Sequence, residues 1–461
     1  MRLRLTVAAT LTTLTIVGSA AAQQAWLQDR RYGQGVGLRA GDVEFHPSLA
    51  AEMGYDSNYF QRSNVGIEAP LYDAWRLRIT PSLSLSSLKQ RIRDSEAVGT
   101  TPSITYNLGG YLTYNELFGS EQVADERHLD AGVGGRIDLL NNRPVGIDLY
   151  GDYMRSGEPS NDPNLALAPA FDRGSARGGL GATWRPGGGL FEWRLGYEAA
   201  YNYFEDAPYD RLQNLNHTIN TRGRWRFLPR TALVYSAGYT FVRYLKDDSP
   251  QPNGDYVEAR VGLNGLITNR FAVTANLGWT STFYEGQAQT TVQNYDGYVM
   301  NAQLKYFLIP TATAETAQAG ISSIALGYQR DFSNSYLGTF YIRDYGYLKL
   351  ETFFAGQFVA SVQGGIGRYS YPESDPLNGS FEQTRFDIQA FGEYRFSDTF
   401  GINTSISYDR TKGKGPNPEG VLVQAGNADD PNTPADEATP DLYDNLEYSR
   451  FQAYLGLRAF W

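Results

Sequence analysis

The chain ends in residues 446–461, LEYSRFQAYLGLRAFW, where apolar residues alternate with small, polar or charged ones. In a strand, successive side chains point to opposite faces, so Leu455, Leu457 and Trp461 share one face while Gly456 and Arg458 share the other. Such a strand suits a wall between lipid and water. Only a closed barrel can build that wall from strands, because hydrocarbon cannot satisfy the hydrogen bonds of an open sheet edge. The stretch therefore predicts the last strand of a transmembrane barrel, in which Leu457→Arg is harmful and Gly456→Ser mild. A soluble β-sandwich strand is the alternative.

Residues 1–22 have the composition of a secretory signal peptide. Two arginines near the start precede an uncharged run rich in apolar residues and threonine, and small residues up to Ala22 supply a cleavage site before Gln23. No later stretch reaches the roughly 18 consecutive apolar residues that a membrane helix needs. We expect residues 23–42 to be a short periplasmic lead and residues 43–461 to form the barrel.

The composition allows a barrel and limits the partners. Cleavage removes two arginines and no acid, so the formal charge goes from −10 to −12, which argues against nucleic acid as a partner. The chain has no cysteine, so its stability cannot come from disulfides. Its 33 tyrosines and 49 glycines accompany a mean hydropathy of −0.42. A barrel can have this polar average because only alternate residues need to be apolar.

The alternation of polar and apolar residues predicts an all-β, antiparallel, up-and-down transmembrane barrel of about 18 strands. An even number of strands returns the C-terminus to the side of the N-terminus, the periplasm. The expected strands are 43–55, 72–86, 102–115, 125–139, 145–155, 171–185, 190–204, 213–228, 231–244, 255–267, 270–284, 294–307, 321–333, 339–353, 357–371, 381–396, 399–411 and 445–461.

Connection lengths support this count, because every second connection should be a short periplasmic turn. Tight-turn residues occupy 141–144, 186–189, 228–230, 268–269 and 397–398, whereas the longer, polar connections are 61–71, 156–170, 245–254, 372–380 and 412–444. Two expected turns are too long, 87–101 and 308–320, and the second is expected to hold a short periplasmic helix. The acidic, proline-rich segment 412–444 is interpreted as a solvated outer loop, with a lumen plug or a divalent-cation site bridging lipopolysaccharide as alternatives.

Many charged residues take the phase opposite to the apolar face, which predicts a wet lumen. They are Arg76, Arg78, Arg136, Arg194, Arg222, Arg224, Arg226, Arg260, Arg385, Arg395 and Arg458, with Glu258, Asp387 and Glu393 among the acids. Two interpretations remain open. The arginines brace the wall by pairing with carboxylates, including Asp138 and Glu192, or unpaired ones line a path for an anionic solute.

Three short motifs resemble a family of outer-membrane β-barrel porins. They are HPSL at 46–49, GYDSNYF at 54–60 and TPSLSL at 80–85. Members of that family often accompany exopolysaccharide export machinery, and similar barrels serve gliding in myxobacteria. In physical terms, Asp56 and Asn58 suit a tight turn after the first strand; a calcium or sugar contact is the alternative.

The resemblance implies a Gram-negative outer-membrane location and a set of partners. An aromatic C-terminal residue is the usual assembly signal of such barrels, which gives that role to Trp461, with Leu455 and Leu457 on the same face. Implied partners are outer-membrane lipid and lipopolysaccharide, the barrel-assembly machinery, and periplasmic export or motility proteins.

No signature of catalysis or of a cofactor accompanies these features. His46, His128 and His217 lie in three different expected strands, and no His/Cys cluster has metal-ligand spacing. The expected function is a porin-like conduit, foremost for surface polysaccharide. The alternative is a closed structural anchor for a gliding or adhesion machine, and an outer-membrane hydrolase comes a distant third.

Overall fold

The structure is a computed structural model. It describes residues 37–40, 43–61, 71–87, 103–157, 172–186, 190–205, 209–228, 230–249, 251–285, 293–309, 322–335, 339–354, 357–374, 379–414 and 447–461. The predicted signal peptide, the segment 308–320 beyond residue 309 and most of the segment 412–444 lie outside these residues, so those predictions stay predictions.

Eighteen strands form one closed antiparallel barrel, so the predicted fold class is confirmed. Every expected strand is present, with ends that differ by no more than four residues. The strands are β2 (Val43–Asp56), β3 (Ala74–Ser87), β4 (Ile104–Gly119), β5 (His128–Leu139), β6 (Val145–Ser156), β7 (Arg173–Trp184), β8 (Phe191–Phe204), β9 (Asn214–Leu228), β10 (Thr231–Tyr244), β11 (Gly254–Leu266), β12 (Phe271–Tyr284), β13 (Asp296–Ile309), β14 (Ser322–Asn334), β15 (Phe340–Phe354), β16 (Phe358–Ser374), β17 (Gly379–Arg395), β18 (Phe400–Lys414) and β19 (Ser449–Phe460).

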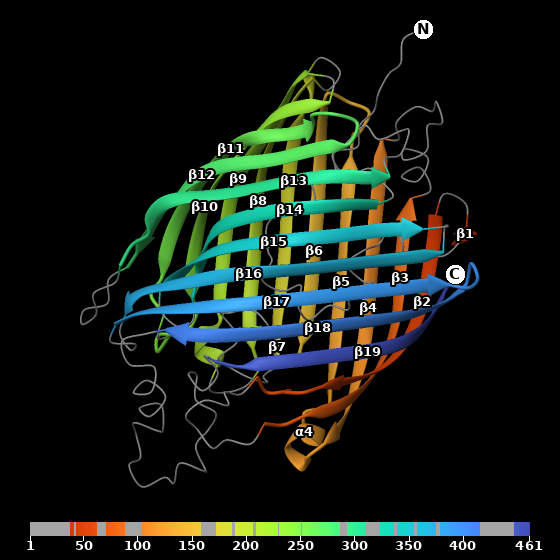
Figure 1. The fold of residues 1–461 in the computed structure, drawn as a ribbon. Coiled ribbons are helices and arrows are strands. Elements are labelled where there is room, and N and C mark those ends of the chain that lie inside the picture. The colour runs from red at the N-terminus through yellow and green to blue at the C-terminus, as the bar shows by residue number, and fades with distance from the viewer. Residues whose placement is uncertain are drawn as a thin grey trace.

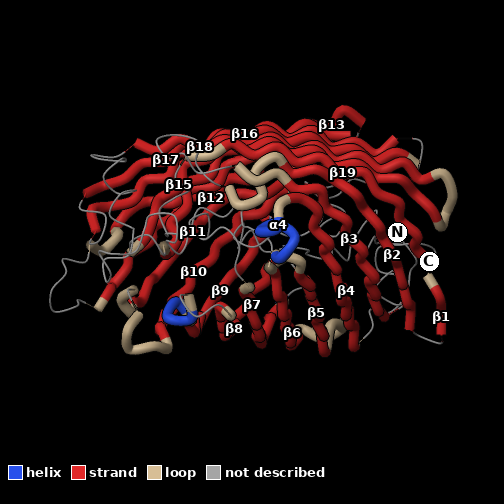
Figure 2. Tube along the Cα trace, turned by 90° about the horizontal axis from the view of Figure 1, so that it is seen from below, coloured by secondary structure: helices blue, strands red, loops and turns tan. Residues whose placement is uncertain are grey.

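The barrel closes where the last strand meets the first. β19 pairs with β2 from Phe460↔Ser48 to Gln452↔Asp56, and every other strand pairs with its neighbours in sequence. The strands of the two walls cross steeply in Figure 1, as expected for strands tilted against the barrel axis. The end-on view in Figure 2 shows them running around a common interior.

Among the described residues, three short elements lie outside the eighteen strands. β1 (Leu38–Ala40) pairs with Val43–Phe45 of β2, beyond the point where β19 ends. α4 (Glu121–Asp125) follows β4 and begins at Ser120, whose hydroxyl accepts the Val123 N–H. A 3₁₀ turn, η3 (Asp210–Leu212), precedes β9. None of the three was predicted, because each is too short to show a hydrophobic period.

The outer surface is an apolar belt with aromatic rings at both edges. Leu455 and Leu457, each 60% exposed, and Trp461, 43% exposed, lie on this outer face as their strand phase predicts. Ring pairs Trp184–Phe191 and Phe396–Phe400 lie near one edge, and Tyr55–Trp75 and Phe386–Tyr408 near the other. A band of this kind with two aromatic girdles is the lipid-facing surface of an outer-membrane barrel.

The two ends of the barrel differ. The C-terminus lies at the end that carries the tight turns at 140–144 and 396–399, and α4 lies at the opposite end (Figure 1). Outer-membrane barrels keep short turns in the periplasm and longer connections outside, so we expect the α4 end to be the extracellular mouth. Among the helices that the structure describes, none is long and apolar enough to cross a membrane.

Pairs of tyrosine and glycine on neighbouring strands explain part of the composition. The Tyr347 ring lies over Gly327, where an added Cβ would be 2.2 Å from the ring. Tyr454 lies in the same way over Gly54, at 2.0 Å. Each glycine leaves room for the partner's ring to lie flat on the wall, a packing known to support glycine in sheets.

Candidate functional site

The lumen face contains two groups of charged side chains with different exposure. One group, which we call the closure seam, lies on β17–β19, β2 and β3, and its charged side chains are almost fully buried. The other, which we call the basic wall, lies on β5–β11. Most of its arginines are partly exposed, although Arg194 and its partner Asp148 are buried. The two predicted roles of the arginines therefore separate in space.

Five residues of the closure seam lie opposite one another in register on five neighbouring strands. Glu393, Asn403, Gly456, Glu52 and Arg78 pair in succession across β17, β18, β19, β2 and β3. Because Gly456 has no side chain, the Asn403 amide reaches over β19 and donates to Glu52 Oε1 at 2.5 Å. Glu52 also pairs with Arg78 at 3.0 Å, so side chains of β18, β2 and β3 are linked across the junction of β19 and β2.

Further buried ion pairs complete the seam. Arg450 Nη2 lies 2.5 Å from Asp56 Oδ2, and both side chains are at most 1% exposed. Asp56 also accepts the Asn58 N–H at 3.1 Å, which is the turn that the GYDSN motif predicts. The predicted role of Asp56 was thus incomplete, because its carboxylate also neutralises a buried arginine on β19. Two more pairs are Arg458–Glu393 at 2.6 Å and Arg385–Asp409 at 2.5 Å.

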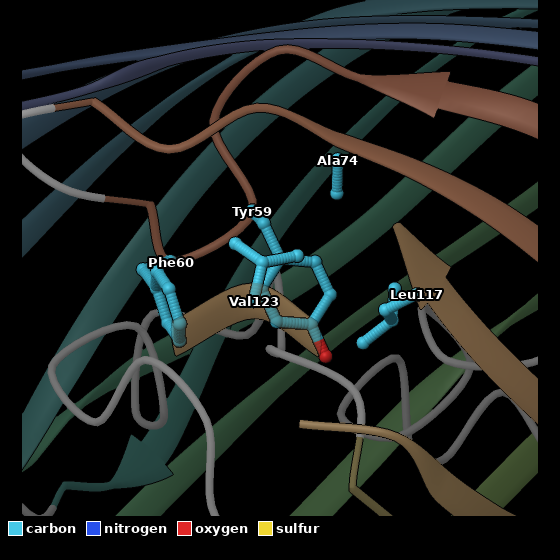
Figure 3. Close-up of a cluster of buried hydrophobic side chains, with 5 residues drawn as sticks. All are labelled: Tyr59, Phe60, Ala74, Leu117 and Val123. Carbon is cyan, nitrogen blue, oxygen red and sulfur yellow. The ribbon is translucent and has the colours of Figure 1, made fainter. Parts of the chain in front are cut away.

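An apolar cluster lies at the extracellular mouth beside the seam. Tyr59, Phe60, Ala74, Leu117 and Val123 are buried together (Figure 3). Val123 belongs to α4, which projects inside the barrel outline in Figure 2. The residues after β2 and the helix after β4 therefore fold against the lumen side of the wall and narrow the mouth there.

Arginines stand directly opposite each other in the basic wall. Arg194 on β8 pairs in register with Arg222 on β9. The Arg194 side chain lies over Gly181 and Gly196, donates to Asn220 on β9 at 3.2 Å and reaches Asp148 on β6 at 2.7 Å. Without side chains on the two glycines, its guanidinium can cross a neighbouring strand.

Among the described residues, no carboxylate forms an ion pair with Arg222. Asp148 is shared between Arg194 and Arg136, whose Nη2 lies 3.5 Å away. Glu192, the acid nearest in register, pairs with Arg224 at 3.1 Å. Arg222 makes no hydrogen bond or ion pair with any side chain in the part of the chain that the structure describes. It is the excess positive charge of the basic wall.

The end of β14 also contacts residues of the basic wall. The β13–β14 ladder stops at Arg330, and the next residue, Asp331, lies 3.7 Å from Arg260 on β11. The Phe332 ring packs against Tyr256 of β11 at 5.7 Å. Since β12 and β13 separate β11 from β14 in the wall, the end of β14 must turn inward. It covers the basic wall near the mouth.

The structure places every predicted lumen residue in the lumen phase and gives most of the arginines a partner. The partners are Glu52 for Arg78, Asp138 and Asp148 for Arg136, Asp148 for Arg194, Glu192 for Arg224, Glu258 and Asp331 for Arg260, Asp409 for Arg385, Glu393 for Arg395 and Arg458, and the amide of Asn115 for Arg76. Arg226 is half-buried on β9. Asp387 differs from expectation, because it accepts the Tyr345 hydroxyl at 3.0 Å.

Sequence reasoning did not predict many of the ion pairs. Glu52, Asp56, Asp148, Asp409 and Arg450 all have lumen phase, which was the one signal available. Phase alone does not give their partners. Asp56 pairs across 394 residues, Asp148 is reached from the next strand but one, and Glu52 and Asp409 pair with arginines on adjacent strands whose exact register the sequence does not supply.

The histidines lie in three separate places. His128 Nε2 is 3.6 Å from Asp130, His46 lies 3.8 Å from Glu44, and His217 contacts the Tyr197 hydroxyl at 2.6 Å. Within the described ranges, no group of three His, Asp or Glu side chains is arranged to hold a metal ion.

Comparison with known proteins gives structural likeness only. No protein family model matches the chain. No curated protein matches it by sequence. Similar solved structures include OpdK of Pseudomonas aeruginosa with vanillate, at 11% identity, covering 90% of this chain and 99% of that chain with a TM-score of 0.44. OccAB3 of Acinetobacter baumannii is 9% identical, and the match covers 90% of this chain and 99% of that chain with a TM-score of 0.44. The FrpB iron transporter of Neisseria meningitidis is 9% identical, and the match covers 92% of this chain and 82% of that chain with a TM-score of 0.46.

The membrane assignment rests on the chain's own features: a closed register, an apolar outer belt with two aromatic girdles, and a charged lumen. The chain is a transmembrane β-barrel of the outer membrane.

Proposed function

We propose that the barrel is a conduit for anionic solutes, with acidic surface polysaccharide as its cargo. The observation that carries the proposal is Arg222, a partly exposed lumen arginine without a carboxylate partner, directly opposite Arg194. Like charges opposite each other destabilise a sheet, and Asp148 offsets this cost for Arg194 but not for Arg222, whose charge is left to interact with a passing or bound anion. Charged rings and patches of this kind select ions in other pores.

The path is expected to follow the basic wall rather than the whole lumen. The charges of the closure seam are neutralised and buried, so they neither attract a charged solute nor leave space for one. On the basic wall, Arg136 has a side chain that is 43% exposed, and Ser236, between Arg222 and Arg260 in register, is exposed as well. Periplasmic export proteins would deliver the polysaccharide to the end where the short turns lie.

Replacing Arg222 alone tests the proposal more sharply than replacing its neighbours, because Arg224 already pairs with Glu192. Purified barrels in planar bilayers under a salt gradient should prefer anions. Arg222→Gln should reduce that preference by about threefold, since a unit charge about 6 Å away in water contributes about 0.7 kcal/mol. Arg368→Gln, which removes the same charge from the outer face, is the matched control. An unchanged anion preference in Arg222→Gln would contradict the proposal.

A second candidate is a structural anchor for a gliding or adhesion machine. The buried seam and the apolar cluster at the mouth favour it, because both fill space that a wide pore would leave open. Folded barrels that give no conductance in bilayers would favour the anchor over the conduit. Motility or adhesion proteins would then be its partners.

A further inference from the structure

Charged side chains also ring the outer face of the barrel at the extracellular end. Most of them neutralise one another. Each of four arginines on this face has its own carboxylate: Arg155–Glu205, Arg243–Asp255, Arg330–Asp344 and Arg368–Glu382. This part of the outer rim therefore carries no excess positive charge.

β18 departs from this pattern. Arg410 and Lys412 are exposed on its outer face, two residues apart. Neither makes a hydrogen bond or ion pair with another side chain within the described ranges. Their register neighbours on β17, Phe386 and Thr384, carry no charge, and neither does Ser449 opposite Arg410 on the other side. The carboxylate of Glu447, before β19, accepts the Gly413 N–H at 3.0 Å. The nearest acid on the same face of β17, Glu382, is held by Arg368.

Directly below these two cations the apolar belt begins. Tyr408 precedes Arg410 on the same face and packs against Phe386 at 6.4 Å, and Phe451 pairs with Tyr408 in register. Ile406, one step further, is 45% exposed. Two cations above an apolar surface at the extracellular edge lie at the height where lipid head groups of the outer leaflet meet acyl chains.

We propose that Arg410 and Lys412 form a binding site for the phosphate groups of lipopolysaccharide, with its acyl chains on the belt around Ile406 and Phe451. Alternate residues of a strand lie roughly 7 Å apart, so one phosphate fits between the two side chains. The guanidinium offers a planar fork of donors and the ammonium a compact charge, a combination suited to a phosphate. The site does not depend on what the lumen conducts.

Binding of labelled lipopolysaccharide to the purified barrel in detergent, followed by fluorescence anisotropy, tests the site. Arg410→Gln/Lys412→Gln should raise the Kd by about tenfold or more, because each basic residue near a charged membrane surface contributes about 1 kcal/mol. Arg410→Lys/Lys412→Arg keeps both charges and should bind nearly as the parent does. The matched control, Arg330→Gln/Arg368→Gln, removes two outer-face cations that are already neutralised and should change the Kd little.

Two further probes separate the sources of the phosphate. Dephosphorylated lipopolysaccharide should bind the parent as weakly as intact lipopolysaccharide binds the Gln double variant. Inorganic phosphate at millimolar concentration should not displace the lipid, because it lacks the acyl chains. The proposal is overturned if the Gln double variant binds like the parent, if both double Gln variants lose binding equally, or if dephosphorylated lipid binds as tightly as intact lipid. Heat-modifiable migration on gels establishes that each variant is folded.

Discussion

At the scale of single residues, burial decides what each charge does. Asp56 and Arg450 are buried and in contact, whereas Arg222 stands partly exposed without a carboxylate. Removing the partner of a buried charge destabilises the folded protein, because no water replaces the partner. A charge facing a wet lumen can be removed at little cost. Similar arginines in one sequence phase therefore have different roles.

Asp56→Ala should destabilise the barrel by about 3–5 kcal/mol, because it leaves the Arg450 guanidinium buried beside an empty position. Glu382→Ala breaks an exposed pair on the outer face and should change stability by about 1 kcal/mol or less. Urea unfolding in detergent or lipid, followed by tryptophan fluorescence, measures both. Equal losses for the two variants would show that burial at the seam has no energetic weight.

At the scale of elements, β19 shows how far sequence phase can be trusted. The lipid face was predicted correctly, since Leu455 and Leu457 are exposed outside. The expectation that Gly456→Ser is mild fails on geometry. A Cβ there would lie 2.5 Å from Glu52 Cγ and 2.8 Å from Asn403 Oδ1, which meet over this glycine.

Leu457→Arg should cost about 2–4 kcal/mol if the residue lies near the bilayer midplane. Gly456→Ser should cost about 1–3 kcal/mol for a different reason, overpacking of the seam. Gly238→Ser is the matched control, because the nearest atom to its added Cβ, on the lumen side of β10, is 3.6 Å away. The same unfolding measurement ranks the three, and a Gly456→Ser barrel as stable as Gly238→Ser would contradict the seam geometry.

Strands were predictable because each one crosses from water to lipid to water and must alternate along its whole length. Residues 231–244, for example, were predicted with both ends correct. The inward turn of β14 after Arg330 was not predictable, since its phase continues unchanged while the ladder to β13 stops. The contact between Arg194 and Asp148 was also not predictable, because it depends on the absence of side chains at Gly181 and Gly196.

At the scale of the whole molecule, orientation follows from the connections. The barrel has no cysteine, so single introduced cysteines report on one site each. Asp247→Cys, in the exposed connection after β10, should react with a membrane-impermeant maleimide on intact cells. Asn142→Cys, in the exposed turn between β5 and β6, should react only after the outer membrane is permeabilised. The reverse labelling pattern would invert the barrel in the membrane.

The pairing of β19 with β2 has a consequence for how the chain folds. Asp56 and Arg450 are separated by 394 residues, and Glu52 and Asn403, which meet over Gly456, by 351. The entropy of closing so long a loop is lost before any seam contact forms, and topologies dominated by such distant contacts fold slowly. No shortened chain can complete the sheet, so an interrupted synthesis leaves two bare edges that invite aggregation. Synthesis of β19 is therefore a kinetic limit on folding: until this strand is present the sheet cannot close, and the chain has to be held unfolded or degraded.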